Sequence, residues 1–315
     1  MARHWGVTLL FVATAPVVAA ELPARFEHDR VFVEPRVAGQ VVDFYTDTGG
    51  GWNMLPHKLV AKLKLRAGQP VENEQQPDQP LQTVEFPEWD AAAAIPLPTL
   101  DRFLGNRLAT VDVDDGAGFL GSRWFAGKVW AFDYGAHTLR WLEDGKIPAG
   151  MSRIPMTMAH ERGMYWPRIE VRIDGEAVPM LLDTGATARL SSKVASQQGV
   201  SAGTAVATSF MIHSRIERWH QQHPDWQIIE RGDVSLDDPQ RMIEVPEVVV
   251  AGHAVGPVWF AERPDANFVE GMSMMTDAPV EGALGGSAYR YFRMVLDYPG
   301  QAAYFAPLIK KTPAG

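Results

Sequence analysis

Apolar and polar residues alternate over short stretches of this chain, and Gly and Pro interrupt these stretches at close intervals. Alternation with a period of two is typical of strands that bury one face. We expect strands at 37–45, 169–173 and 247–250, and short helices at 55–61 and 190–196. The pattern therefore predicts a mostly β protein with a few short helices.

The pattern also occurs twice. When the chain is shifted by 136 residues, segment 36–47 aligns with segment 172–183 without a gap. Each segment leads into the tripeptide Asp-Thr-Gly, at 47–49 and at 183–185, and a predicted short helix follows. Similarity at a fixed spacing indicates an internal duplication.

A second string recurs further along each copy. It is an apolar pair followed by Gly, Phe119-Leu120-Gly121 in the first copy and Ala283-Leu284-Gly285 in the second. We therefore divide the chain into an N-terminal lobe at 21–150 and a C-terminal lobe at 151–315. Each lobe carries one Asp-Thr-Gly and one apolar-Gly string.

The position of the tripeptides points to chemistry. Each Asp-Thr-Gly falls where a predicted strand ends and a turn begins, and Gly allows the tight backbone geometry of such a turn. Catalytic side chains are often held on turns by a rigid sheet. Asp47 and Asp183 are thus candidates for a pair of catalytic acids.

The first 20 residues have the features of a secretory signal peptide. Arg3 and His4 precede an apolar stretch from Val7 to Ala15, and the small residues 18–20 come before Glu21. A membrane anchor needs about 20 apolar residues, and this stretch is shorter. We expect the protein to be exported, to the periplasm or outside the cell, and not to be inserted in a membrane.

Composition narrows the possible partners and cofactors. The formal net charge is −9, which disfavours nucleic acids and anionic membrane surfaces. The chain has no Cys, so disulfides and thiol chemistry are excluded, and a periplasmic setting is favoured. His213, His220 and His223 lack a metalloprotease spacing. We expect neither a metal nor an organic cofactor.

With its two Asp-Thr-Gly motifs and two apolar-Gly strings, the chain resembles the pepsin/retropepsin-like aspartic proteases in their fused, two-lobed form. The resemblance covers most of residues 30–307. It implies a mostly β, two-lobed, pepsin-like fold with short helices after each psi loop and a cleft between the lobes. The residues to which it assigns roles are the catalytic Asp47 and Asp183, the supporting Thr48, Gly49, Thr184 and Gly185, and the psi-loop Leu120, Gly121, Leu284 and Gly285.

In such a site the two acids share one proton, because like charges about 3 Å apart cannot both ionise cheaply. One carboxylate then activates water while the other carboxyl group hydrogen-bonds the scissile carbonyl. Thr48 and Thr184 are expected to hydrogen-bond to the opposite loop.

The sequence departs from the family at two places. Gly50-Gly51 follows the first motif where the family usually has Ser, Thr or Ala, and no Tyr lies between Tyr45 and Tyr134 to serve a flap. We place the flap at 81–96, with Trp89 as its possible aromatic residue. Because residues 50 and 186 offer no hydroxyl to the acids, we expect a mild pH optimum, about pH 4 to 6.

These observations favour a monomeric aspartic endopeptidase that cleaves extended polypeptides. A chain that carries both halves of its site does not need to dimerise for catalysis. Two alternatives stay open: a catalytically inactive relative that binds peptides or another partner in the cell envelope, and a β-rich scaffold of an envelope complex.

Overall fold

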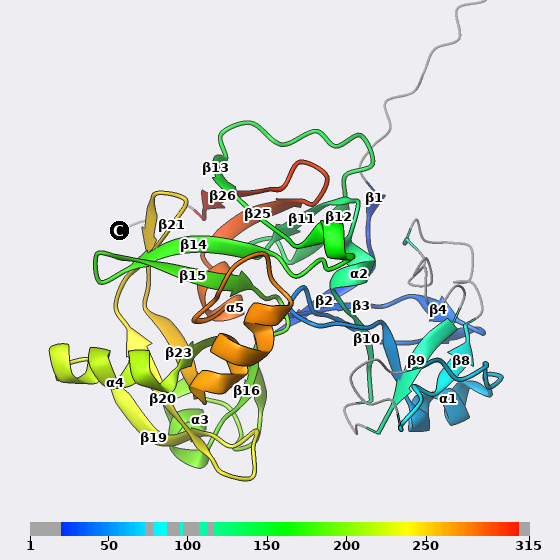
Figure 1. Cartoon of the computed structure of the whole chain (residues 1–315), viewed down its shortest axis with the longest axis horizontal. Helices are drawn as coiled ribbons and strands as arrows, with labels where there is room; N and C mark the ends of the chain where they lie inside the picture. The colour runs from blue at the N-terminus through cyan, green and yellow to red at the C-terminus, as the bar shows by residue number, and fades with distance from the viewer. Residues whose placement is uncertain (1–19, 73–77, 87–94, 97–106, 113–115, 309–315) are drawn as a thin grey trace, which may run out of the picture.

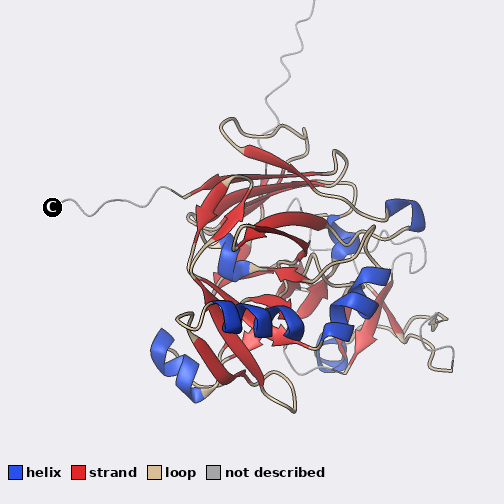
Figure 2. Ribbon diagram, turned by 60° about the vertical axis from the view of Figure 1, so that its left-hand side comes forward, coloured by secondary structure: helices blue, strands red, loops and turns tan. Residues whose placement is uncertain are grey.

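The computed structural model describes residues 20–72, 78–86, 95–96, 107–112 and 116–308. The chain forms two lobes built mostly of strands, with only short helices among them (Figures 1 and 2). The predicted mostly β, two-lobed architecture is confirmed. No helix within these ranges is long and apolar enough to cross a membrane. The predicted signal peptide lies outside the described residues, apart from Ala20, which belongs to the first strand.

The first lobe is built on a seven-stranded sheet. Its two central strands carry the first motif and the apolar-Gly string behind it. In spatial order the strands are β2 (Ala24–Glu27), β3 (Arg30–Val33), β6 (Phe44–Thr46), β10 (Gly118–Leu120), β7 (Met54–Pro56), β9 (Arg107–Val111) and β8 (Thr83–Glu85).

The second lobe is built on a larger, nine-stranded sheet. In spatial order its strands are β19 (Ile228–Asp233), β20 (Gln240–Val245), β23 (Val258–Arg263), β18 (Ser209–Ile212), β24 (Gly282–Leu284), β15 (Glu176–Leu182), β14 (Arg168–Ile173), β21 (Val248–Val250) and β22 (His253–Val255). A separate pair, β16 (Thr187–Arg189) and β17 (Ala205–Ala207), follows the second motif. The expected strands at 169–173 and 247–250 correspond to β14 and β21.

A six-stranded sheet joins the two halves of the chain (Figure 1). Its strands, in spatial order, are β1 (Ala20–Glu21), β12 (Thr138–Trp141), β11 (Val129–Asp133), β25 (Phe292–Asp297), β26 (Ala302–Pro307) and β13 (Ser152–Pro155). Strand β11 of the first half pairs antiparallel with β25 of the second. Trp130 of β11 packs against Trp124, with the ring centres 4.1 Å apart, and both side chains are buried.

The duplication is visible in the backbone. Ala38 and Gly39 have φ of 50° and 78°, and the equivalent Asp174 and Gly175 have φ of 53° and 74°. Two successive left-handed residues form the tight turn that joins neighbouring antiparallel strands. The expected single strand at 37–45 is therefore wrong: this turn divides it into β4 (Arg36–Val37) and β5 (Gln40–Val41), and β6 follows.

Short helices occur at equivalent places in both lobes. After the motifs come α1 (His57–Leu63) and α3 (Ser192–Gln198), which end at left-handed Lys64 and Gly199. Directly after the apolar-Gly strings come α2 (Ser122–Phe125) and α5 (Gly286–Tyr289), so the helices predicted after each psi loop are confirmed. A longer helix, α4 (His213–Gln222), lies in the second lobe, and the described residues of the first lobe contain no counterpart.

Candidate active site

Strands β6 and β15 bring the two Asp-Thr-Gly motifs to the centre of the molecule. In each lobe this strand runs parallel to the apolar-Gly strand, β10 beside β6 and β24 beside β15. The amide of Asp47 donates to the carbonyl of Leu120 at 2.9 Å. The amide of Asp183 donates to the carbonyl of Leu284 at the same distance. The apolar-Gly strings thus lie directly behind the motifs, in the same way in both lobes.

The two carboxyl groups meet between the lobes. They lie within hydrogen-bonding reach of each other, and each is packed against the glycine of the opposite motif. A Cβ atom on Gly49 would overlap Cγ of Asp183, and one on Gly185 would overlap Cγ of Asp47. Only glycine at both positions lets the carboxyl groups approach so closely.

Burial and mutual repulsion make this pair hold a proton. Burial, followed by the negative charge of Asp47, raises the pKa of Asp183 well above its ordinary value. Burial also raises the pKa of Asp47, but hydrogen bonds from Asp183 and from the amides of Gly50 and Gly49 oppose the shift. Oδ1 of Asp47 is buried without a donor among the described residues. Asp183 also accepts a hydrogen bond from the amide of Gly185 at 2.7 Å, so both carboxyl groups are partly stabilised as anions, and the buried pair as a whole holds one shared proton.

The two buried threonines connect the motifs through reciprocal hydrogen bonds. The amide of Thr48 donates to Oγ1 of Thr184 at 3.1 Å, and the amide of Thr184 donates to Oγ1 of Thr48 at 2.9 Å. Each hydroxyl also donates across to the other lobe, Thr48 to the carbonyl of Leu182 at 2.7 Å and Thr184 to that of Thr46 at 3.1 Å. The hydrogen bonds expected from the resemblance are present, and they tie one motif to the other.

A second pair of cross-lobe contacts holds the glycine carbonyls, and no sequence pattern indicates it. Nε1 of Trp166, in the second lobe, donates to the carbonyl of Gly49 at 2.9 Å. The hydroxyl of Tyr45, in the first lobe, donates to the carbonyl of Gly185 at 3.0 Å and contacts Oγ1 of Thr187 at 2.6 Å. Each motif is thus supported from the opposite lobe at equivalent carbonyl groups.

The amides of the apolar-Gly strings have different partners in the two lobes. The amide of Gly121 donates to Oδ1 of Asn53 at 3.0 Å. The amide of Gly285 donates to Oγ of Ser209 at 3.0 Å, and that hydroxyl lies 2.9 Å from Oγ of Ser287. These buried amides would otherwise lack acceptors, so the three polar side chains stabilise the loops behind the acids.

One further difference lies beside Asp183. Its amide also contacts the hydroxyl of Tyr289 at 3.2 Å, and this hydroxyl donates to the carbonyl of Leu284 at 2.5 Å. The equivalent residue of the first lobe is Phe125, which has no hydroxyl. Only the second motif has this additional contact.

Steric contacts explain why glycine occupies the two positions after the first motif. A Cβ atom on Gly50 would lie 2.6 Å from Oδ2 of Asp47, and one on Gly51 would lie 3.3 Å from the Trp166 ring. The carboxyl group of Asp47 therefore lies over position 50, where the family usually has a side chain. The departure noted in the sequence matches the local packing.

A pocket of about 410 Å³ opens beside the acids, within the size range of ligand sites. Gly49 and Asp183 form part of its wall. The other residues that line it belong to the second lobe: Leu181, Phe210, Arg263, Asn267, Phe268 and Met272.

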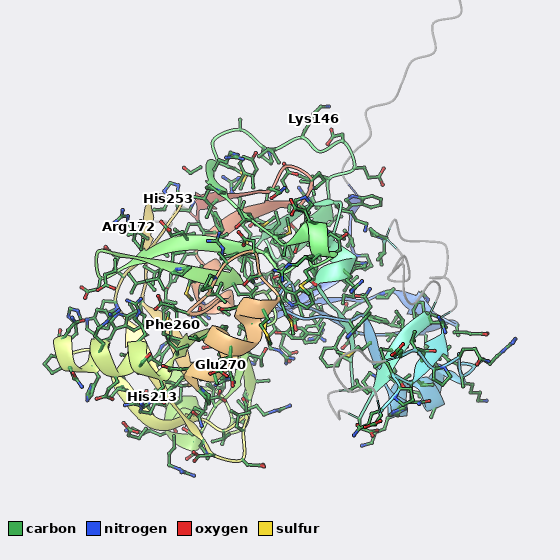
Figure 3. The ribbon with its side chains drawn as sticks, viewed as in Figure 1. Lys146, Arg172, His213, His253, Phe260 and Glu270 are labelled. Carbon is green, nitrogen blue, oxygen red and sulfur yellow. The ribbon has the colours of Figure 1, made fainter. Side chains whose placement is uncertain are left out.

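The segment predicted as the flap lies partly outside the described residues, and Trp89 is among those outside. The described ends of segment 81–96 contribute β8 and buried Phe86 and Ile95. Within the described ranges no three His, Asp or Glu residues form a metal-binding group. His213 contacts Glu262 and lies far from His253 (Figure 3).

The chain matches no protein-family model, and no curated protein sequence matches it. Its structure is similar to the crystal structure of an aspartic proteinase from Irpex lacteus, with a TM-score of 0.50 and 9% sequence identity. The similarity covers 94% of this chain and 99% of that protein. At this identity the likeness shows the fold, which is the two-lobed, pepsin-like fold of an aspartic proteinase.

Proposed function

We propose that this protein is an aspartic endopeptidase that hydrolyses peptide bonds of extended polypeptides through a water molecule activated by Asp47 and Asp183. The main support is that the two carboxyl groups, one from each lobe, lie within hydrogen-bonding reach. Two acids that share one proton supply a general base and a general acid at one place. The cross-lobe hydrogen bonds of the threonines keep them there.

The proposed reaction proceeds in two steps. The ionised carboxylate of the pair removes a proton from water while the oxygen of that water bonds to the scissile carbonyl carbon, and the protonated partner donates its proton to the carbonyl oxygen. The tetrahedral intermediate then returns a proton to that partner. The proton taken from water passes from the first carboxyl group to the amide nitrogen as the C–N bond breaks, which leaves a carboxylic acid, an amine and the original pair with one shared proton.

We propose polypeptide as the substrate class because an extended peptide can bind along a sheet-lined cleft as if it were an added strand, with alternate side chains in pockets. We also propose that the mature protein is exported and acts as a monomer. Cell fractionation and light scattering test these two proposals.

The activity is tested by incubating the protein, without its first 20 residues, with a mixed peptide library between pH 3 and pH 7. We expect cleavage that a statine-type inhibitor blocks, because its hydroxyl group occupies the position of the attacking water. Asp47→Asn should abolish cleavage, whereas the surface control Asp144→Asn should not. Peptide binding without cleavage, unchanged by Asp47→Asn, would instead indicate an inactive peptide-binding protein.

A further inference from the structure

The pocket beside Asp183 contains a buried positive charge that the proposed mechanism does not use. Arg263, the last residue of β23, is only 8% exposed and lines this pocket. Its guanidinium carbon lies 4.0 Å from the centre of the Phe210 ring, which lines the same pocket. A substrate side chain that enters beside Asp183 therefore meets a cation.

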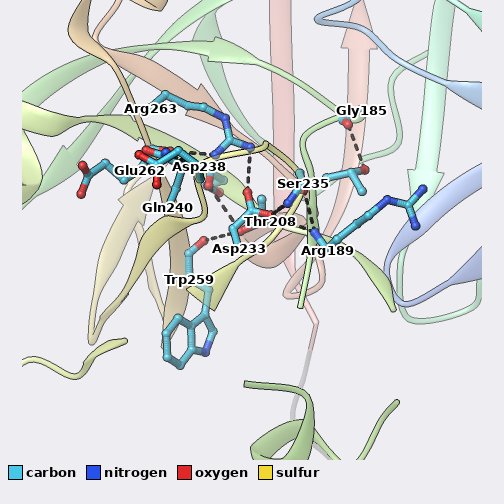
Figure 4. A network of polar contacts seen from close by, with 12 residues as sticks. Gly185, Arg189, Thr208, Asp233, Ser235, Asp238, Gln240, Trp259, Glu262 and Arg263 are labelled. Carbon is cyan, nitrogen blue, oxygen red and sulfur yellow. Dashed lines mark hydrogen bonds and ion pairs between the residues drawn. The ribbon is translucent and has the colours of Figure 1, made fainter. Parts of the chain in front are cut away.

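Asp233 holds this arginine in place without presenting an acceptor to the pocket. Nη2 of Arg263 donates to Oδ2 of Asp233 at 2.9 Å. The other oxygen, Oδ1, accepts hydrogen bonds from the amide of Arg189 and from the amide and hydroxyl of Ser235 (Figure 4). Asp233 is fully buried, and both its oxygens are engaged.

Arg263 keeps hydrogen-bonding capacity for a ligand. A guanidinium carries five N–H groups, and besides the bond to Asp233 only Nη1 donates, to the carbonyl of Glu262 at 2.7 Å. Its other N–H groups have no acceptor in the part of the chain that the structure describes. A carboxylate is the best match for them, because its two oxygens and its charge complement the planar fork of the guanidinium.

The other residues that line the pocket are suited to the methylene groups of a substrate side chain. Leu181, Phe210, Phe268 and Met272 are apolar, and Asn267 adds a second polar side chain. A glutamate side chain combines two methylene groups with a terminal carboxylate, so it matches both parts of the pocket. Lysine would bring its ammonium group toward the guanidinium, and leucine would leave the N–H groups of Arg263 without acceptors.

We propose that this pocket is a subsite for an acidic substrate side chain, glutamate above all, and that Arg263 is its specificity-determining residue. This inference rests on the proposed peptidase function. Two negative charges oppose an acidic ligand: that of Asp233, which is already paired with Arg263, and the single charge of the catalytic pair, which shares a proton. We expect the charge-assisted hydrogen bonds from the remaining N–H groups of Arg263, made at contact distance, to outweigh this repulsion.

The test uses quenched fluorescent octapeptides that carry Glu, Gln, Leu or Lys at each position around the scissile bond, assayed at pH 6, where Glu is ionised. We expect kcat/KM to be about tenfold higher for Glu than for Gln at one position, as for a charge-assisted contact. In Arg263→Met the two peptides should differ less than about twofold.

Two further variants serve as controls for the comparison of Glu and Gln peptides. Arg263→Met leaves Asp233 buried without its cation, which can prevent folding, so Arg263→Met/Asp233→Asn is measured as well. The matched control is Arg241→Met, which also removes an ion-paired arginine, on the neighbouring strand β20. Arg241 does not line the pocket, so this variant should keep the preference for Glu.

Equal rates for Glu and Gln in the wild type, or a Glu preference that survives in a folded Arg263 variant, would overturn the inference while leaving the peptidase function intact. Binding of the same peptides to Asp47→Asn, followed by fluorescence anisotropy, separates the two proposals. Tighter binding of Glu peptides without any cleavage by the wild type would support the subsite and reject the peptidase function.

Discussion

The two lobes hold equivalent backbone groups with different side chains. The glycine carbonyl of the first motif accepts from Trp166, whereas that of the second accepts from Tyr45. The amide behind the first motif donates to Asn53, and the amide behind the second donates to Ser209. A duplicated backbone has the same buried polar groups in both copies, and each must be satisfied. The side chains that satisfy them can differ, so sequence identity is lost faster than geometry.

The two acids, by contrast, have similar electrostatic surroundings. Burial raises the pKa of both carboxyl groups, and backbone amides oppose the shift at both, those of Gly50 and Gly49 at Asp47 and those of Gly185 and Gly49 at Asp183. The negative charge of Asp47 further raises the pKa of Asp183. A buried pair that shares one proton supplies a base and an acid at one place.

We expect the largest effect on catalysis, where removing the acid of either lobe should reduce activity equally. Asp47→Asn and Asp183→Asn should each lower kcat by about 10³-fold or more, and the double variant should be no worse, because groups that act as a unit are not additive. Steady-state kinetics on one peptide measures all three. A single variant that keeps a tenth of the activity would show that the two acids do not act as a pair.

The next largest effect should follow from replacing Thr48 or Thr184, the threonines that hydrogen-bond across the lobes. Thr48→Val and Thr184→Val each leave a buried amide and a buried carbonyl without a partner, which should cost about 1–3 kcal/mol of stability. Chemical denaturation measures the loss. The Thr→Ser variants keep the hydroxyl and serve as matched controls, and a Val variant as stable as its Ser control would contradict a bracing role.

Two carboxyl groups, those of Asp183 and Asp277, should make the stability of the fold change with pH in opposite directions. The pKa of Asp183 is raised in the folded state, so the folded protein keeps a proton that the unfolded chain loses near pH 4. Stability therefore falls as pH rises from there to the raised pKa. The loss is about 1.4 kcal/mol for each pH unit over which only the folded state holds the proton. The Asp183→Asn variant lacks this loss, so its stability relative to the wild type should increase as pH rises.

Asp277 provides the comparison of opposite sign. Burial opposes the shift, but hydrogen bonding and the charge of Arg168 lower the pKa of Asp277. Its stabilising contribution is therefore present above the unfolded pKa and is lost as pH falls, and Asp277→Asn should approach the wild type at low pH. Denaturation at pH 3, 5 and 7 measures both variants. A constant difference between Asp183→Asn and the wild type would contradict the shared proton.

The smallest effects should come from the carbonyl contacts. Tyr45→Phe removes a buried hydroxyl with two partners, and Trp166→Phe removes one donor that is partly exposed, so we expect losses of about 1–2 and about 0.5–1 kcal/mol. Both should lower kcat more than they raise KM, because they position the acids without touching the substrate. Equal losses would mean that exposure does not distinguish the two contacts.

The sequence predicts the features that depend on local patterns, several of which occur in both halves of the chain. The Asp-Thr-Gly and Leu-Gly strings and the mostly β lobes follow from local patterns. So do the short helices predicted at 55–61 and 190–196, which the structure places two residues later, at 57–63 and 192–198. Sequence reasoning fails at Trp166, Tyr45 and Arg263, because their roles depend on residues of the other lobe or of distant strands. Tyr45 carries a weak signal, since the aligned residue in the second copy is the apolar Leu181.

The single strand expected between 37 and 45 is wrong for a local reason. Its apolar alternation continues through Ala38 and Gly39, but positive φ at both residues reverses the chain there. Ala rarely adopts this conformation, so the residue types alone do not indicate the turn. The aligned Asp174-Gly175 is a more typical turn sequence.

The six-stranded antiparallel sheet that joins the two halves limits how this chain can be divided. Strand β11 has β12 on one side and β25, from the other half, on its second side. Either half produced alone would present a long unpaired strand edge, which is a ready template for aggregation. We therefore expect either half to aggregate on its own unless that edge is covered.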